Sequence, residues 1–253
     1  MSVSIEVIVQ YCQELLQPSR FQDYCPNGLQ VAGKERISKI VSGVTACQQL
    51  LDAAVEAKAD LVLVHHGYFW KGEEQTVVSI KKQRLKTLLI NDLNLLAYHL
   101  PLDAHSVFGN NVQLAEKMGW CITSGMDAEI GQSLVLLGEL EQACTATELA
   151  AHIGIVLNRE PLHVKGHDRL IKKIAWCTGS AQSYIDAVSK TDVDAFISGE
   201  ISEQTVHLAR ELGIDYYAAG HHATESYGVQ ALGEHIAREF AIEHQFIDIY
   251  NPV

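Results

Sequence analysis

The chain has 253 residues, of which 47% are hydrophobic and 20% charged, and its formal net charge at pH 7 is −12. The apolar fraction excludes a disordered chain, and the length suits one large domain or two small ones. The acidic balance disfavours binding to nucleic acid backbones, because neutralising phosphates requires clustered Lys and Arg.

The apolar runs and the first residues carry no sign of membrane insertion or export. No apolar run reaches the roughly 18–20 residues that a transmembrane helix requires. The first residues include Glu6 and have no basic segment ahead of their apolar residues, so we predict no secretory signal. We therefore expect a cytoplasmic protein that does not bind membranes.

Two segments of the chain resemble each other. Residues 39–66 and 173–200 align without a gap, with Asp60 opposite Asp194 and His66 opposite Glu200. Each copy has the order of a short apolar strand, an amphipathic helix and a second apolar strand. Apolar strands separated by helices favour right-handed crossovers and parallel pairing, so we predict a duplicated α/β fold.

The elements of the first copy begin with a strand over residues 39–44. Thr45 and Gln48 are spaced as a capping box for the helix that follows. Residues 61–64 form a continuous apolar run, which is typical of a strand buried on both faces. A helix over 82–93 and a strand over 94–98 continue the first half.

The second copy continues in the same way, with a helix over 202–212 and a strand over 215–219. In both halves this last strand is followed by a histidine and, four residues later, an acid: His99 with Asp103, and His221 with Glu225. We predict a first half over 1–130, a hairpin-and-helix linker over 131–164 and a second half over 165–253. Two related halves would face a shared cleft.

Two other features are interpreted as structural. A dense basic run on the helix of the first half is predicted to form a solvated face; it comprises Lys81, Lys82, Arg84 and Lys86. The six cysteines show no paired spacing, so we predict small buried side chains rather than a zinc ribbon or a disulfide framework.

Three histidine clusters follow apolar strands, at the carboxyl ends where open α/β sheets bind ligands. They are His65 with His66, His99 with Asp103, and His221 and His222 with Glu225. Successive residues of a strand point to opposite faces, so His65 and His66 are expected to serve two ions. Imidazole and carboxylate suit Zn, Fe or Mn, and the clusters hold more ligands than one catalytic zinc uses. A two-metal site is therefore predicted.

Some roles stay open. Pro101 is expected to block a regular helix after His99, which leaves His99 as a ligand, a proton shuttle or a residue that orients a ligand. Glu200 is either part of the cleft or an acid at a helix N-terminus. Thr178-Gly179-Ser180 precedes a helix and is a weak candidate for anion binding.

Four motifs together resemble the GTP cyclohydrolase I type 2 homologue family of NGG-interacting-factor-like proteins. They are VHHGYFW (64–70), HLPLD (99–103), DAFISGE (194–200) and GHHATE (220–225). The resemblance implies a dinuclear site with ligands His65, His66, Asp103, His221 and Glu225, the last bridging both ions. It also implies a toroidal hexamer, built as a trimer of dimers, with the sites facing an internal cavity.

These observations lead to two expectations about function. The first is a dinuclear metal-dependent hydrolase that acts on a small molecule, a nucleotide or purine-like ring, with His99 or His222 as catalytic proton shuttle. The second is a ring-shaped metal-binding module for single-stranded nucleic acid or a protein partner, as in a DNA damage response. A steep salt dependence of binding would favour the nucleic acid version of the module.

Overall fold

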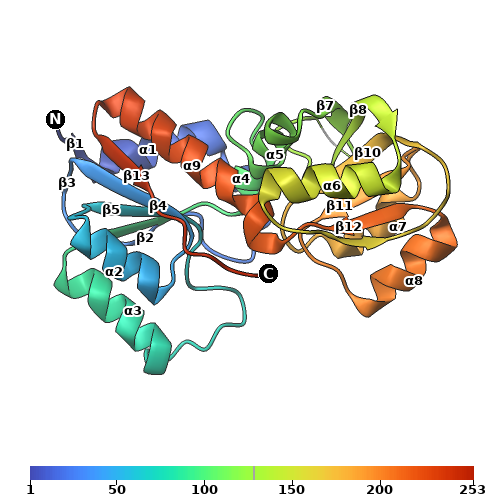
Figure 1. Cartoon of the computed structure of the whole chain (residues 1–253). Coiled ribbons are helices and arrows are strands. Elements are labelled where there is room, and N and C mark those ends of the chain that lie inside the picture. Colours follow the sequence, from blue (N-terminus) through green and yellow to red (C-terminus); the bar gives the residue numbers. More distant parts are fainter. Residues whose placement is uncertain (128) are drawn as a thin grey trace. The chain divides into compact units, whose positions relative to one another are not determined.

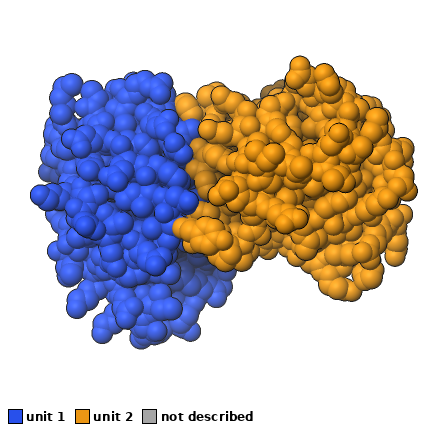
Figure 2. Space-filling model, in the orientation of Figure 1, with its two compact units in different colours: residues 1–102, 228–249 blue, residues 103–227, 250–253 orange. Residues whose placement is uncertain are grey.

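The computed structural model describes residues 1–127 and 129–253 and shows an α/β protein with two mixed β-sheets (Figure 1). The chain divides into two compact units, which Figure 2 distinguishes by colour. Unit 1 comprises residues 1–102 and 228–249, and unit 2 comprises residues 103–227 and 250–253. The predicted α/β class is confirmed.

The sheet of unit 1 has the strand order β13-β4-β5-β6-β2. All neighbours are parallel except β2, which runs antiparallel to β6. The strands are β2 (Gly28–Val31), β4 (Lys39–Thr45), β5 (Leu61–His66), β6 (Asn94–Ala97) and β13 (Glu243–Phe246). A separate two-stranded sheet pairs β1 (Val3–Ser4) with β3 (Arg36–Ile37).

Helices cover both faces of this sheet. In Figure 1, α1 (Ile5–Leu16) and α9 (His221–Phe240) lie on one side, and α2 (Gln48–Glu56) and α3 (Ser79–Ile90) on the other. On the α2 side, Leu50 and Leu51 are fully buried in one apolar cluster with Val62 of β5. Because β5 is buried on both faces, it has the continuous apolar sequence expected of such a strand.

The sheet of unit 2 has the strand order β7-β8-β10-β11-β12-β9. Only β10, β11 and β12 are parallel to one another; the outer strands run antiparallel. The strands are β7 (Cys121–Gly125), β8 (Leu136–Cys144), β9 (Leu162–Val164), β10 (Ile171–Cys177), β11 (Ala195–Ser198) and β12 (Asp215–Ala218).

Successive side chains of β10 point alternately to the two apolar cores of unit 2. Ile174 and Trp176 pack with the helices α5 (Asn110–Met118) and α6 (Ala146–Leu157). Ala175 and Cys177 pack on the opposite face, with α7 (Ile185–Val188) and α8 (Glu203–Leu212). This period of two is what a central strand covered on both sides requires. Three shorter helices complete the chain: η1 (Pro18–Arg20), α4 (Leu100–Ala104) and η2 (Gln182–Tyr184).

The two segments that align in the sequence pair their strands in the same register. Ile40 of β4 pairs with Leu61 of β5, and at the aligned positions Ile174 of β10 pairs with Ala195 of β11. Strands β4, β5 and β6 of unit 1 therefore follow the same order and direction as β10, β11 and β12 of unit 2.

The segment 131–164, predicted as a linker, supplies β8, α6 and β9 to unit 2, and both strands belong to its sheet. The two compact units also have different bounds from the predicted halves, because α9 begins in unit 2 and ends in unit 1, where β13 pairs with β4. A linker and a sheet strand can have similar composition, and they differ in whether the segment pairs with a neighbouring strand.

Two local expectations need correction. Only half of the cysteines are buried, namely Cys12, Cys25 and Cys177, and Cys121 on β7 is exposed. The basic run on α3 is not uniformly solvated, since Lys81 and Arg84 are partly buried while Lys82 and Lys86 are exposed. Across the described residues, no helix combines the length and the apolar character needed to cross a bilayer.

Candidate metal centre

Three histidines of unit 1 converge at the carboxyl ends of neighbouring strands. His65 and His66 are the last residues of β5, and His99 follows β6. The ring centroids lie 4.6 Å apart for His65 and His66, 5.1 Å for His65 and His99, and 5.8 Å for His66 and His99. One ligand atom from each of the three lies within 4.8 Å of the others, so the group is suited to hold a metal ion. The two rings of β5 thus lie together, although successive strand residues were expected to diverge.

Oxygen atoms fix two of these rings. His65 is fully buried, and its Nδ1 lies 2.9 Å from the backbone oxygen of Tyr98. A carbonyl only accepts, so Nδ1 carries the proton and Nε2 presents its lone pair. Nδ1 of His66 lies 3.0 Å from Oγ1 of Thr45. Partners of this kind set the tautomer and orientation of histidines that bind metals.

The contact of Thr45 with His66 replaces the predicted capping box. Thr45 is the last residue of β4, and the N-cap of α2 is Cys47, whose side chain makes no capping hydrogen bond. The strand runs farther than predicted, which turns the threonine hydroxyl from a helix cap into a partner of a histidine ring.

His99 is held by a carboxylate from a distant part of the chain. Its Nδ1 lies 2.7 Å from Oδ1 of Asp23, whose other oxygen accepts from the backbone N–H of Leu100 at 3.0 Å. Burial alone would raise the pKa of Asp23, but hydrogen bonds from His99 and Asn27 outweigh it and lower that pKa to about 2. Asp23 is therefore an ionised acceptor that orients His99.

Pro101 does not block the helix that follows His99. The short helix α4 includes it as its second residue. Proline is tolerated in the first turn, because the backbone N–H groups there have no partner within the helix.

Trp70 borders the histidines of unit 1. Its ring centroid is 4.9 Å from that of His99 in an edge-on arrangement, and 6.0 Å from that of His66. The indole N–H donates to the backbone oxygen of Gly67 at 3.1 Å, which fixes the ring. An aromatic wall of this kind lowers the local dielectric and strengthens the electrostatic interactions at the site.

Asp103 is a buried carboxylate of unit 2, with 6% of its surface exposed. Its Oδ1 accepts from Nδ2 of Asn110 at 2.8 Å and from the hydroxyl of Thr178 at 3.3 Å. Asn111 donates to the backbone oxygen of the same residue at 3.2 Å. These neutral donors position the carboxylate.

His221 and Glu225 share the first turns of α9, as their spacing of four predicted. Nε2 of His221 lies 2.9 Å from Oε2 of Glu225, and its Nδ1 lies 2.6 Å from Oε1 of Glu200. Burial would lower the pKa of His221, but Glu225 and Glu200 together raise it to about 9. Glu200 therefore orients His221 and does not cap a helix; the N-cap of α8 is Ser202.

Gly179 allows the backbone of the loop after β10 to approach Glu225. Its φ is +68°, and a Cβ there would lie 2.0 Å from Oε1 of Glu225. The neighbouring Ser180 hydroxyl donates to Glu200 at 3.2 Å. This loop, weakly suggested by the sequence as an anion site, instead contacts carboxylates.

His222 is partly buried in the first turn of α9, where its backbone N–H donates to the backbone oxygen of Val253 at 2.9 Å. Within the described residues, its ring belongs to none of the groups whose ligand atoms lie within 4.8 Å of one another. Its predicted role as a shuttle stays a prediction.

Several residues that orient the site were missed by sequence reasoning. They are Asp23, Asn27, Thr45, Asn110 and Asn111. One signal was available: two successive asparagines open the helix after Asp103, where Asn is an unusual choice for a buried position. The loop residue Asp23 offered no such signal, because a polar residue beside Pro26 is what any turn contains.

Comparison with known proteins supports the resemblance seen in the motifs. A protein of Pseudomonas aeruginosa called GTP cyclohydrolase 1 type 2 homolog is 56% identical over 252 residues, which cover 100% of both chains. The solved structure of the protein ybgI, described as of unknown function, has 48% identity and a TM-score of 0.95, covering 99% of this chain and 100% of that one. The crystal structure of TTHA1606 from Thermus thermophilus has 31% identity and a TM-score of 0.89, with the same coverage. The model of one family matches residues 3–252, and the chain belongs to that family, Duf34/NIF3 (NGG1p interacting factor 3).

Proposed function

We propose that the protein is a dinuclear metal-dependent hydrolase that acts on a nucleotide or purine-like ring. The observation that carries the proposal is the way the histidines are held. His65, His99 and His221 each direct Nδ1 to an oxygen, from Tyr98, Asp23 and Glu200 respectively. In His65 and His99 this arrangement turns Nε2 towards a ligand position, and in His221 Nε2 lies 2.9 Å from Oε2 of Glu225, which is proposed to bind the same metal pair.

Five side chains are proposed as the metal ligands: His65, His66, Asp103, His221 and Glu225. These side chains would hold two ions of Zn, Fe or Mn, and Glu225 would be the ligand shared by both. Asp103 lies in α4, four residues after His99 in the sequence. Three imidazoles and two carboxylates match the ligand preferences of these metals.

The bound ions would supply Lewis acidity and lower the pKa of water towards neutrality. The chain's own residues would shield the site from solvent and orient its catalytic groups. Trp70 shields the histidines of unit 1, and Asp23 holds His99 in one orientation. His99 is thereby proposed to accept and return a proton through Nε2, with His222 as a second shuttle. Five ligands, one bridging, would leave open positions for a substrate.

The experiment measures metal content and turnover in matched variants. Purified untagged protein, reconstituted with Zn, Mn or Fe, should contain two ions per chain by elemental analysis and should hydrolyse members of a nucleotide library. Glu225→Ala should lose both ions, whereas Glu239→Ala, an exposed acid on the same helix, should lose neither. If the units bound metal independently, Glu225→Ala would keep the ion of His65 and His66, and the dinuclear proposal would be wrong.

We also propose that the protein assembles as a hexamer, a trimer of dimers. The family resemblance carries this proposal, and the end of α3 adds to it, since Leu89 and Ile90 are 63% and 70% exposed. Side chains of this size are commonly covered in an assembly. Light scattering coupled to size-exclusion chromatography measures the mass, and a monomer at micromolar concentration would contradict the proposal.

A further inference from the structure

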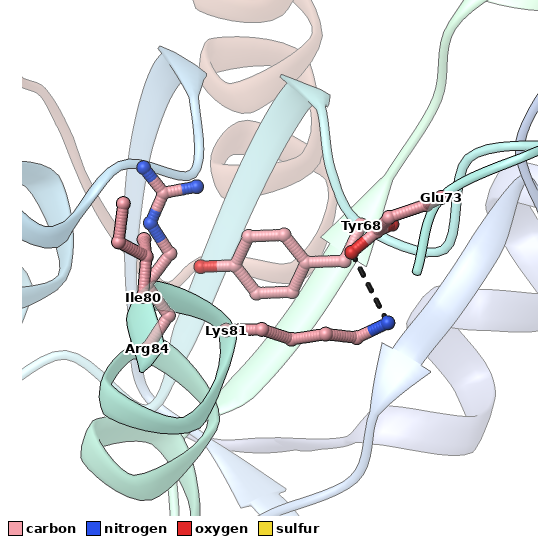
Figure 3. A pocket seen from close by; sticks show the side chains of 5 residues that line it. All are labelled: Tyr68, Glu73, Ile80, Lys81 and Arg84. Atoms are coloured by element: carbon pink, nitrogen blue, oxygen red, sulfur yellow. Dashed lines mark ion pairs between the residues drawn. The ribbon is translucent and has the colours of Figure 1, made fainter. Parts of the chain in front are cut away.

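A pocket of about 240 Å³ lies beside α3 within unit 1 (Figure 3). It is lined by Tyr68, Glu73, Ile80, Lys81 and Arg84. None of these residues is among the proposed metal ligands. The pocket combines a loop that follows β5 with one face of α3, where residues 80, 81 and 84 are neighbours at helical spacing.

Two of the three charges in the pocket neutralise each other. Nζ of Lys81 lies 3.1 Å from Oε1 of Glu73, as the dashed line in Figure 3 marks, and it also donates to the backbone oxygen of Glu74 at 2.7 Å. The other carboxylate oxygen of Glu73 accepts from the backbone N–H of Trp70 at 3.0 Å. Each carboxylate oxygen of Glu73 therefore has a partner other than Arg84.

Within the described residues, Arg84 has no anionic partner. Its guanidinium carbon lies 6.0 Å from the centroid of the Tyr68 ring. Its Nε is buried without a hydrogen-bond partner, and no ion pair joins it to any residue in 1–127 or 129–253. The nearby Tyr68 hydroxyl donates to the backbone oxygen of Ala46 at 2.7 Å. A buried Nε–H donor without an acceptor lowers stability, and a bound anion would offset this cost by supplying the missing acceptor.

We propose that this pocket binds a small oxyanion, a phosphate or carboxylate group, with Arg84 as its main ligand. The planar guanidinium offers parallel N–H donors that match the oxygen pairs of such groups. Glu73 cancels the charge of Lys81, so the lining keeps one positive charge for the anion. The volume is below the roughly 300–1,000 Å³ of pockets for drug-sized ligands, which favours a single small anion over a whole nucleotide. This inference does not depend on the proposed hydrolase activity.

The first experiment titrates inorganic phosphate into the metal-loaded protein by calorimetry. Arg84→Met should weaken binding at this site at least tenfold. Lys86→Met removes one charge from the exposed side of the same helix and should change binding less than twofold. Because phosphate also binds metal ions, the titration is repeated with Glu225→Ala, which should keep the Arg84-dependent site. Equal phosphate binding by wild type and Arg84→Met would overturn the proposal.

Competition identifies the source of the oxyanion. Sulfate should displace phosphate from the Arg84-dependent site if tetrahedral anions are preferred, and acetate should displace it if the natural group is a carboxylate. Either result supports the oxyanion class. Binding of neither phosphate, sulfate nor acetate in an Arg84-dependent manner would refute it.

A stability measurement separates ligand binding from a purely structural role of Arg84. Without phosphate, Arg84→Met should unfold at the same temperature as the wild type or higher, because the variant no longer buries an N–H donor without an acceptor. Saturating phosphate should raise the unfolding temperature of the wild type and leave that of Arg84→Met unchanged. A variant that is less stable than wild type and shows the same phosphate shift would assign Arg84 to packing on Tyr68 alone.

Discussion

Asp60 and Asp194 make matching hydrogen bonds to the backbone in the two sheets. Each carboxylate accepts from two successive backbone N–H groups at the start of the preceding strand: Ser38 and Lys39 at 2.8 and 3.1 Å for Asp60, and Lys172 and Lys173 at 3.0 Å each for Asp194. Each aspartate also donates its own N–H to that strand, at 2.9 and 2.8 Å. The duplication therefore preserves a specific anchor between two parallel strands as well as an apolar pattern.

Removal of this anchor should destabilise the protein. Asp194→Ala leaves two backbone N–H groups without their acceptor, and hydrogen bonds to a charged group contribute about 1.5–3 kcal/mol each. We expect a loss of about 1–3 kcal/mol in the free energy of unfolding by urea, since water reaches part of the site. Asp192→Ala is the control, because that side chain is 94% exposed and pairs with the Lys173 side chain. A loss no greater than in this control would contradict the anchoring role.

Gly179→Ala should disrupt the metal centre. Gly179 and Gly213 have nearly the same backbone, with φ of +68° and +67°, but only at Gly179 does a new Cβ meet Glu225, 2.0 Å away; at Gly213 the nearest atom is 4.0 Å away. Both variants should lose about 1 kcal/mol of stability from the left-handed backbone. Only Gly179→Ala should lose bound metal by elemental analysis. Equal metal content in the two variants would show that Glu225 is not needed at this position.

Asp23 should stabilise the fold in a pH-dependent way. Its folded-state pKa of about 2 lies below the unfolded value of about 3.9, so the ionised group stabilises the protein fully above about pH 4. The contribution, about 2 kcal/mol, is lost as the pH falls towards 2. Asp23→Asn should therefore be less stable than wild type at pH 6, and the gap should narrow at pH 3. Asp52→Asn, at an exposed position on α2, serves as the control variant, and a constant gap for Asp23→Asn would contradict the assignment.

Metal binding should release a proton from His221. In the metal-free protein its pKa is raised to about 9 by Glu225 and Glu200, against the opposing effect of burial, so the ring is protonated at pH 7. A ligand must be neutral, hence the apparent affinity should rise as the pH increases from 7 to 9. Calorimetry in buffers with different ionisation enthalpies measures the released proton. Glu200→Gln should reduce the release at pH 7, and an affinity that is independent of pH in this range would contradict the prediction.

Local patterns in the sequence predicted much of the fold. The apolar runs at 39–44, 61–64 and 94–98 became β4, β5 and β6, each within a few residues of its predicted ends. These predictions succeed because a buried parallel strand must be apolar at every position, whatever its partners are. The spacing of four between His221 and Glu225 likewise predicted their contact, since both lie on one helix.

Local patterns failed where the same residues are compatible with two structures and only the neighbouring elements decide between them. Thr45 has the spacing of a helix cap, but β4 extends through it and its hydroxyl meets His66. Pro101 suggested that no regular helix follows His99. It lies in the first turn of α4, where a backbone N–H would have no partner within the helix. In each case the backbone of a neighbouring element decided the outcome.

By itself, the sequence determined the α/β class, the duplication, the strand ends that carry histidines and the family. Only the tertiary structure decided what orients those histidines and where the compact units end. Asp23 reaches His99 across 76 residues of chain, and β13 returns from the end of the chain to pair with β4. Periodicity records whether a residue is buried, but it carries no information on which distant residue it meets, because many partners satisfy the same burial.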